Sequence, residues 1–455
     1  MDAIEKRQLS IDIAVQVPHD PLRVYVMGNR AVANEPATEK DIKKMQDCLS
    51  EALEAGAIGF STGRSDFHKT SDGEWTPSSE AGVAELTGIA SVLSEMDKGV
   101  LQAVSDFDML RPGDNFDQEF DLIESYFRAG GQRPGSISLM QRDFVPDDWK
   151  KIMSRFETLK AKEGLDIRFQ VAPRAIGSIQ GLRSTFHPLM AFPSYLEIAD
   201  KPFEEKITIM RDAVFKAKLL SETPVQLSGP GSSVPPMIDL LIAQFDAVAE
   251  KLFRLVEDGN LNYEPKASDS IAQMAREASI SSWEMAYDIL LEEDGKALIY
   301  YPIYNYTELN YNNVLKMMRH PQSLPGLSDG GAHVSFICDA SFPTFLLSYW
   351  ARDRVKSGRS GFGLARAIQM LTADCADYLG LEDRGRLKVG KKADLNIIDF
   401  ENLELDIPEI IQDLPAGGHR LLQAAHGYKA TFVSGEQVIS DDQLTSARPG
   451  QLIRA

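Results

Sequence analysis

The sequence has 455 residues, of which 43% are hydrophobic and 25% charged, and these are ordinary values for a folded globular protein. Its 48 Lys and Arg are outnumbered by 67 Asp and Glu, and the resulting net charge of −19 argues against nucleic acid or an anionic membrane as a partner. The three cysteines, Cys48, Cys338 and Cys375, lie far apart, so they indicate no disulfide framework and fit a reducing compartment.

The N-terminal residues are charged and lead directly into the apolar residues 11–15, without the positive and then apolar pattern of a secretion signal. No apolar run along the chain reaches the roughly 18 residues that a membrane-spanning helix needs. The sequence therefore predicts a cytoplasmic protein without a membrane partner.

Short apolar runs alternate with amphipathic stretches along most of the chain. Runs typical of strands covered on both faces lie at residues 11–17, 57–61, 100–105, 136–140, 167–172, 298–301 and 327–328. Helical periodicity lies between them, at residues 39–55, 116–128, 147–162, 240–257 and 281–293. This order predicts an α/β fold with right-handed crossovers, and because no GxGxxG motif opens a helix, it favours a barrel over a doubly wound open sheet.

The first of these helices has clear end signals. Thr38 is a predicted N-cap with Asp41 three residues further on, and Gly56 is a predicted C-terminal stop. After about residue 385 the pattern changes to short strands without helices between them, and Ser434-Gly435 is typical of a hairpin turn. We therefore expect a β/α barrel over residues 1–385 and a small all-β domain over residues 386–455.

Residues 59–63, Gly-Phe-Ser-Thr-Gly, match the GxSxG nucleophile elbow of serine hydrolases. That motif needs a helix directly after the serine, and the polar residues 64–79 have no helical period. We interpret Gly56, Gly59 and Gly63 instead as positions of close approach in a buried strand and at its exit.

Three polar residues follow strand-like runs, where the active site of an α/β barrel lies. His19 and His333 are two of them, and each is equally compatible with a functional and a structural role. The third, Asp329, ends a short apolar run and is followed by two glycines. A carboxylate there can bind a metal or move a proton, and it can equally accept backbone N–H bonds in a turn.

An ordered set of motifs resembles the C-terminal part of the amidohydrolase superfamily. The set comprises Ser328-Asp329-Gly330 and the segments 372–376, 379–381, 383–387, 390–395 and 433–435. Upstream, residues 19–23, 27–28 and 52–62 are similar to the N-acyl-D-amino-acid deacylase (D-aminoacylase) branch. The resemblance implies a (β/α)8 TIM-like barrel with a small β-sandwich portion, and hydrolysis of an amide C–N bond of a small molecule by metal-activated water. The implied cofactor is zinc or another divalent metal, and Asp329 is the implied catalytic residue and metal ligand.

The sequence departs from the family pattern at its metal ligands. It has no His-x-His pair, and the first strand of the barrel and the first sandwich segment are missing, so that it starts near the third barrel strand. Gln102 and Gln141 mark the segments in which deacylases carry histidines. The resemblance therefore predicts a barrel without its first strands, a chain in which the metal is not bound, and open sheet edges that favour a homo-oligomer.

Arg174, His333 and Arg23 are candidate substrate-binding residues, because each lies near a predicted strand end and an arginine can hold a substrate carboxylate. For Arg174 a structural salt bridge is the favoured interpretation, and the substrate contact is the alternative. Two alternative functions stay open at this point. One is a catalytically inactive homologue or N-terminally truncated fragment, and the other is a hydantoinase-like hydrolase of cyclic amides.

Overall fold

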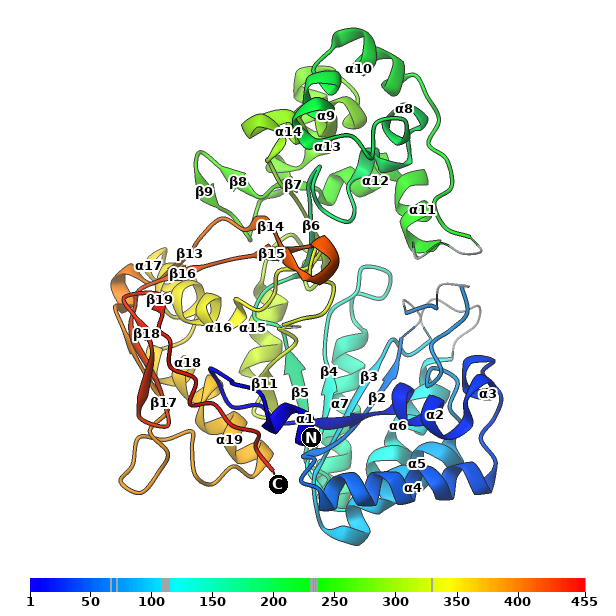
Figure 1. The fold of residues 1–455 in the computed structure, drawn as a ribbon, viewed down its shortest axis with the longest axis vertical. Coiled ribbons are helices and arrows are strands. Elements are labelled where there is room, and N and C mark those ends of the chain that lie inside the picture. The colour runs from blue at the N-terminus through cyan, green and yellow to red at the C-terminus, as the bar shows by residue number, and fades with distance from the viewer. Residues whose placement is uncertain are drawn as a thin grey trace.

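The computed structural model describes residues 1–65, 68–70, 73–108, 115–229, 232, 234, 236–328 and 330–454. Its centre is a six-stranded parallel sheet with the order β1-β2-β3-β4-β5-β11 (Figure 1). The strands are β1 (Gln16–Pro18), β2 (Gly59–Arg64), β3 (Val100–Ser105), β4 (Gly135–Ser138), β5 (Ile167–Val171) and β11 (Ser323–Pro325). The predicted α/β class is confirmed, and the parallel sheet is consistent with an amidohydrolase barrel.

Helices connect successive strands of this sheet, and Figure 1 shows α4 to α7 packed beside it. They are α2 (His19–Met27), α3 (Asn29–Val32), α4 (Glu39–Glu54), α5 (Val83–Met96), α6 (Phe116–Ala129), α7 (Asp148–Glu163) and α15 (Asn312–Arg319), after the short α1 (Asp2–Glu5). In α4, the Thr38 side chain accepts from the Asp41 N–H and the Asp41 carboxylate accepts from the Thr38 N–H, so the predicted N-cap is confirmed as a capping box.

Ser61 lies inside β2, which continues to Arg64, so no sharp turn presents it as a nucleophile. Gly59 has φ +154°, and a Cβ there would lie 2.0 Å from the Val100 carbonyl oxygen on β3. A Cβ on Gly56 would lie 2.4 Å from the Arg454 Cβ, whereas one on Gly63 would have no atom within 4 Å. The predicted close approach is therefore present at Gly56 and Gly59 and absent at Gly63.

Replacing Gly59 with Ala is expected to lower the free energy of unfolding by about 3 kcal/mol, because β2 and β3 would have to separate locally. Urea titration followed by circular dichroism measures this loss. Gly63→Ala in the same strand is the matched control and should change stability by less than about 0.5 kcal/mol. Equal effects of the two substitutions would contradict the close approach at Gly59.

Residues 181–298, here called the helical unit, are inserted between β5 and β11 and have a hydrophobic core of their own, which contains Phe192, Ile207 and Leu290. Figure 1 shows this unit beyond the end of the sheet toward which the β5 arrow points. Its helices are α8 (Pro193–Leu196), α9 (Phe203–Met210), α10 (Ala213–Leu220), α11 (Pro236–Ala243), α12 (Phe245–Val248), α13 (Ile271–Ala278) and α14 (Ser282–Gly295). A small antiparallel sheet of β6 (Ile176–Gln180), β10 (Ile299–Tyr304) and β7 (Phe253–Arg254) connects it to the rest, and β8 (Val256–Glu257) pairs with β9 (Asn260–Leu261).

Two predicted elements were wrong. Residues 240–257 do not form one helix, because Gln244 leaves the helical conformation and Phe253 and Arg254 pair with β10 instead. Residues 327–328 are not a strand, because the last parallel strand lies earlier, with Ser323 to Pro325 in register with β5. Residues 298–301 are in a strand as predicted, but β10 pairs antiparallel with β6 and lies outside the parallel sheet.

The C-terminal part has antiparallel sheets. The helical segments that precede these sheets are α16 (Phe342–Phe345), a π-helical segment (Leu346–Asp353), α17 (Arg354–Lys356), α18 (Leu364–Leu371) and α19 (Ala373–Leu379). The largest of the sheets is formed by β12 (Leu395–Ile398), β17 (Tyr428–Val433), β18 (Glu436–Ser440) and β19 (Gln443–Leu444). The predicted hairpin turn is confirmed, with positive φ at Ser434 and Gly435. Two-stranded ladders join β13 (Glu404–Leu405) to β16 (Ala425–His426), and β14 (Glu409–Leu414) to β15 (Gly418–Leu422). Within the described residues, no helix is both long and apolar enough to span a membrane.

Candidate active site

The residues that follow β1 to β5 and β11 lie at one edge of the parallel sheet, where enzymes of this architecture place their chemistry. We call this the strand-end region. The sequence analysis predicted Asp329, His333, Arg174 and Arg23 as its functional residues. Asp329 lies outside the described residues, and the other three are described below.

A buried charge cluster joins the ends of β2, β3 and β4. The Asp106 carboxylate accepts a hydrogen bond of 2.6 Å from the Ser65 hydroxyl and one of 3.2 Å from Arg142 Nη2. The same Arg142 nitrogen donates to the Ser105 carbonyl oxygen at 2.9 Å. Because Asp106 and Arg142 are both buried, their opposite charges stabilise each other and hold the three strand ends together.

A second pair holds the end of β2 against α6. Arg64 donates to both Glu119 carboxylate oxygens, from Nε at 2.5 Å and from Nη2 at 3.0 Å. The Ser105 hydroxyl also donates to Glu119, at 3.1 Å. This two-pronged geometry is the preferred one for arginine and carboxylate, and it leaves Arg64 with a structural partner.

Arg23 belongs to a third buried group, around Glu85. One Glu85 carboxylate oxygen accepts from Arg23 Nε at 2.8 Å and lies 3.0 Å from His19 Nε2, while His19 Nδ1 lies 2.9 Å from the Thr62 hydroxyl. The Arg23 guanidinium also donates to the carbonyl oxygens of Pro77 and Glu35, at 2.8 and 2.6 Å. Arg23 and His19 are each 1% exposed, so both hold α2 against β2 and α5, and the substrate role of Arg23 stays a prediction.

Burial alone would raise the pKa of Glu85, but the hydrogen bond from His19 and the charges of His19 and Arg23 outweigh it and lower that pKa below 4.5. Ionised Glu85 therefore contributes stability that is fully present above about pH 4.5 and is lost as the pH falls through the lower folded pKa. We expect the stability difference between the wild type and Glu85→Gln to shrink below pH 4.5 in urea titrations. A difference that is constant from pH 7 to pH 3 would contradict this assignment.

Arg174 lies just after β5 and is 1% exposed. Its Nη2 donates to the Cys338 carbonyl oxygen at 2.6 Å and to the Asp339 carboxylate at 3.2 Å. The guanidinium carbon is 3.8 Å from the centre of the Tyr263 ring and 4.9 Å from that of Phe342. These contacts fix the segment after β11 to the end of β5, and the predicted contact of Arg174 with substrate stays a prediction.

His333 is exposed and has a left-handed φ of +47°. Its ring stacks near that of His68, which follows β2, with 6.0 Å between the ring centres. The structure thus brings together two histidines that are far apart in the sequence, and both are accessible in the strand-end region. Of the predicted substrate-binding residues that are described, His333 has the accessible side chain.

The described residues of the strand-end region do not fit a zinc centre. No group of three or more His, Cys, Asp or Glu side chains close enough to hold a metal occurs in the described ranges. Gln141 is buried and donates to Glu308 at 2.9 Å, and an amide is a poor zinc ligand. We therefore derive no chemical step through a metal.

Sequence reasoning missed the partners of these residues. His68, which is exposed, was not singled out from the sequence, although it follows a predicted strand as His19 and His333 do. Asp106, Arg142 and Glu119 gave no signal of their own, because their partners are separated from them by 14 to 55 positions along the chain.

A model of the amidohydrolase family matches residues 7–439. The chain belongs to the amidohydrolase family. This finding agrees with the parallel sheet and with the motifs around Asp329.

The similar proteins refine this amidohydrolase assignment only in part. Uncharacterized proteins of Mycobacterium tuberculosis and Mycobacterium bovis are 23% identical over 423 residues, or 89% of this chain. The chain spans 63% of the length of those relatives. An N-acyl-D-glutamate deacylase of Alcaligenes xylosoxydans xylosoxydans is 28% identical over 226 residues, which cover 46% of this chain and 42% of that protein. No solved structure matches the chain significantly.

Proposed function

We propose that this amidohydrolase cleaves the amide C–N bond of small N-acyl amino acids, with N-acyl-D-amino acids as its substrate class. The observation that carries the proposal is the similarity to an N-acyl-D-glutamate deacylase over 226 residues, within a chain that the family model matches from residue 7 to residue 439. The accessible strand-end region supports it, because it offers a small polar substrate two imidazoles beside the segment that contains Asp329.

In the proposed reaction Asp329 accepts a proton from the attacking water and delivers it to the leaving amine, as a general base and then a general acid. The residues on either side support this role, because Ser328 is partly exposed and Gly330 is exposed at the end of the parallel sheet. His333 contacts the substrate in this proposal, with His68 beside it. Arg174 and Arg23 hold the surrounding segments in place.

A substrate panel tests the proposal and separates it from hydrolysis of cyclic amides. Purified protein is incubated with N-acetyl-D-amino acids, their L-enantiomers and 5-substituted hydantoins, and the released amine or opened ring is measured by liquid chromatography. We expect release from the D-substrates, with N-acetyl-D-glutamate among them, at least about tenfold faster than from the L-forms. If the protein opened hydantoins and released no amine from any N-acyl amino acid, hydrolysis of cyclic amides would replace the proposed function.

The second candidate is a non-catalytic member of the family. One specific observation favours it: the charges at the described strand ends are paired with one another, Asp106 with Arg142 and Glu119 with Arg64. The substrate panel and a metal analysis of the purified protein by mass spectrometry together distinguish the catalytic from the non-catalytic candidate. Zinc near one equivalent per chain would favour the enzyme, and the absence of both zinc and turnover would establish the second candidate.

A further inference from the structure

A cavity of about 500 Å³ lies in the helical unit, away from the residues proposed to carry the reaction. Its walls come from residues 182–206 and Leu227, and from Gln412 and His419 at the C-terminal ladder. Figure 1 shows that ladder, β14 with β15, beside β6 at the base of the helical unit. The Thr185 N–H donates to the Ser335 carbonyl oxygen at 3.3 Å, so the cavity wall contacts the segment that carries His333.

The charged residues that line this cavity are all cations, although Lys201 is paired with Glu205, which lies outside the lining. Arg183, Lys201 and Lys206 line it together with two histidines, and none of its described lining residues is Asp or Glu. Arg183 and Lys206 are the lining cations for which no ion pair to a described carboxylate is formed, in a chain whose net charge is −19. A cationic pocket in an acidic protein selects an anionic ligand.

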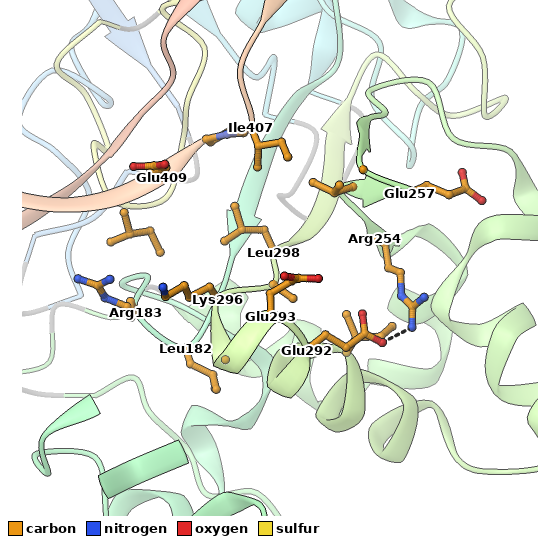
Figure 2. A pocket seen from close by; sticks show the side chains of 18 of the residues that line it. Leu182, Arg183, Arg254, Glu257, Glu292, Glu293, Lys296, Leu298, Ile407 and Glu409 are labelled. Carbon is orange, nitrogen blue, oxygen red and sulfur yellow. Dashed lines mark hydrogen bonds and ion pairs between the residues drawn. The ribbon is translucent and has the colours of Figure 1, made fainter. Parts of the chain in front are cut away.

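The neighbouring cavity, of about 830 Å³, lacks this property. It shares Arg183 and also contains Arg254 and Lys296, but these cations face Glu257, Asp258, Glu292, Glu293 and Glu409. Figure 2 shows Arg254 in contact with Glu292, and Lys296 between Arg183 and Glu293. Its three cations are therefore outnumbered by five carboxylates of the protein itself.

Lys206 and His187 are the buried polar groups of the smaller cavity. Lys206 is 8% exposed, and its ammonium donates to the Ala199 carbonyl oxygen at 2.8 Å and lies 3.5 Å from the Tyr195 hydroxyl. No ion pair to a carboxylate is formed by Lys206 among the described residues, and Asp200, whose charge acts on it, is exposed. An ammonium group buried without a counter-ion is costly, and a bound anion would offset this cost.

His187 is 3% exposed, and its Nδ1 has no hydrogen-bond partner among the described residues. Its ring packs edge-on against Tyr195, with 4.6 Å between the ring centres. Burial, with the nearby charge of Lys206, lowers the pKa of His187 to about 3, so the imidazole is neutral and can donate one hydrogen bond. Buried polar atoms normally have partners, so the free nitrogen indicates a ligand position.

We propose that this cavity binds a small carboxylate with a short aliphatic tail. The ligand carboxylate accepts hydrogen bonds from the Lys206 ammonium, the His187 imidazole and the Tyr195 hydroxyl. The apolar lining residues contact the tail; they are Leu182, Met190, Leu196, Ala199, Phe203 and Leu227. The proposal is independent of the reaction proposed above, because it concerns a separate set of residues.

Isothermal titration calorimetry of the full chain with hexanoate tests the proposal, with 1-hexanol as the uncharged ligand of equal length. We expect saturable binding of one hexanoate per chain and at least tenfold weaker binding of hexanol. Lys206→Met should weaken hexanoate binding at least tenfold, and Lys296→Met, in the neighbouring cavity, should leave it unchanged.

His187→Phe provides a second variant that keeps the ring and removes its nitrogens, and it should weaken hexanoate binding at least threefold. Circular dichroism shows whether each variant folds. If Lys206→Met does not fold, hexanoate binding by His187→Phe tests the proposal in its place. The proposal is overturned if hexanoate does not bind at millimolar concentrations, if hexanol binds as tightly as hexanoate, or if the folded variants at positions 206 and 187 bind hexanoate as the wild type does.

Discussion

Replacing Asp329 with Asn is expected to lower the rate of amide hydrolysis by about 10²–10⁴-fold, because the amide side chain cannot accept the proton from water or deliver it to the leaving amine. The segment on both sides of this position is accessible, so the substitution should leave the folded structure intact. Initial rates of amine release from N-acetyl-D-glutamate, with thermal unfolding monitored in parallel, measure both effects.

Asp441→Asn is the matched control, since Asp441 is an exposed residue of a C-terminal turn and should tolerate the change without loss of rate. Turnover retained in Asp329→Asn would remove this residue from the mechanism. Loss of turnover together with loss of folding would show instead that Asp329 is a structural turn residue.

Arg23→Met is expected to lower the free energy of unfolding by about 3–5 kcal/mol, the usual cost of removing one partner from a buried ion pair. The substitution leaves Glu85 buried without its arginine, and it also removes the donors to the carbonyl oxygens of Pro77 and Glu35. Urea titration at pH 7 measures this loss, and the activity per folded molecule should stay close to that of the wild type.

Arg30→Met is the control for this experiment. Arg30 also forms two ion pairs, with Glu35 and Asp41, but its side chain is 40% exposed, so the substitution should lower stability far less than Arg23→Met does. If Arg23→Met lost activity with little loss of stability, the substrate contact predicted from the sequence would be the correct role of Arg23.

The parts of the fold that were predicted correctly depend on local signals. Helix α4 follows from a capping box and from Met45, Leu49 and Leu53 at helical spacing, and all three side chains are fully buried. Strands β3 and β5 were predicted from apolar runs without a regular alternation of polar residues. Such runs are typical of strands in a parallel sheet, because both faces of that sheet are covered. In these elements local preference and tertiary packing agree.

The parts that were missed depend on contacts between distant residues. Phe253 and Arg254 continue an apparent helical pattern, but they pair with Tyr300 and Ile299 on β10, and no local signal specifies that ladder. The last parallel strand was placed at residues 327–328, although its register with β5 is set by Ser323 opposite Phe169. The helical unit was not separated from the barrel for the same reason, since its own core becomes evident only from packing.

The candidate site was predictable to a smaller extent than the fold. Position after a predicted strand directed attention to His333, but it could not distinguish an accessible residue from Arg23 and Arg174, which are buried against carboxylates. Only the three-dimensional arrangement shows that the His68 and His333 rings lie 6.0 Å apart. The domain boundary near residue 385, the homo-oligomer and the residue roles stay predictions.

Hydrolysis itself is tested most directly by the origin of the oxygen in the product. The protein is incubated with N-acetyl-D-glutamate in water labelled with heavy oxygen, and the products are analysed by mass spectrometry. We expect acetate that carries one labelled oxygen from water and D-glutamate that carries none. Release of neither product, or release of acetate without the label, would contradict the assignment of this amidohydrolase as a deacylase.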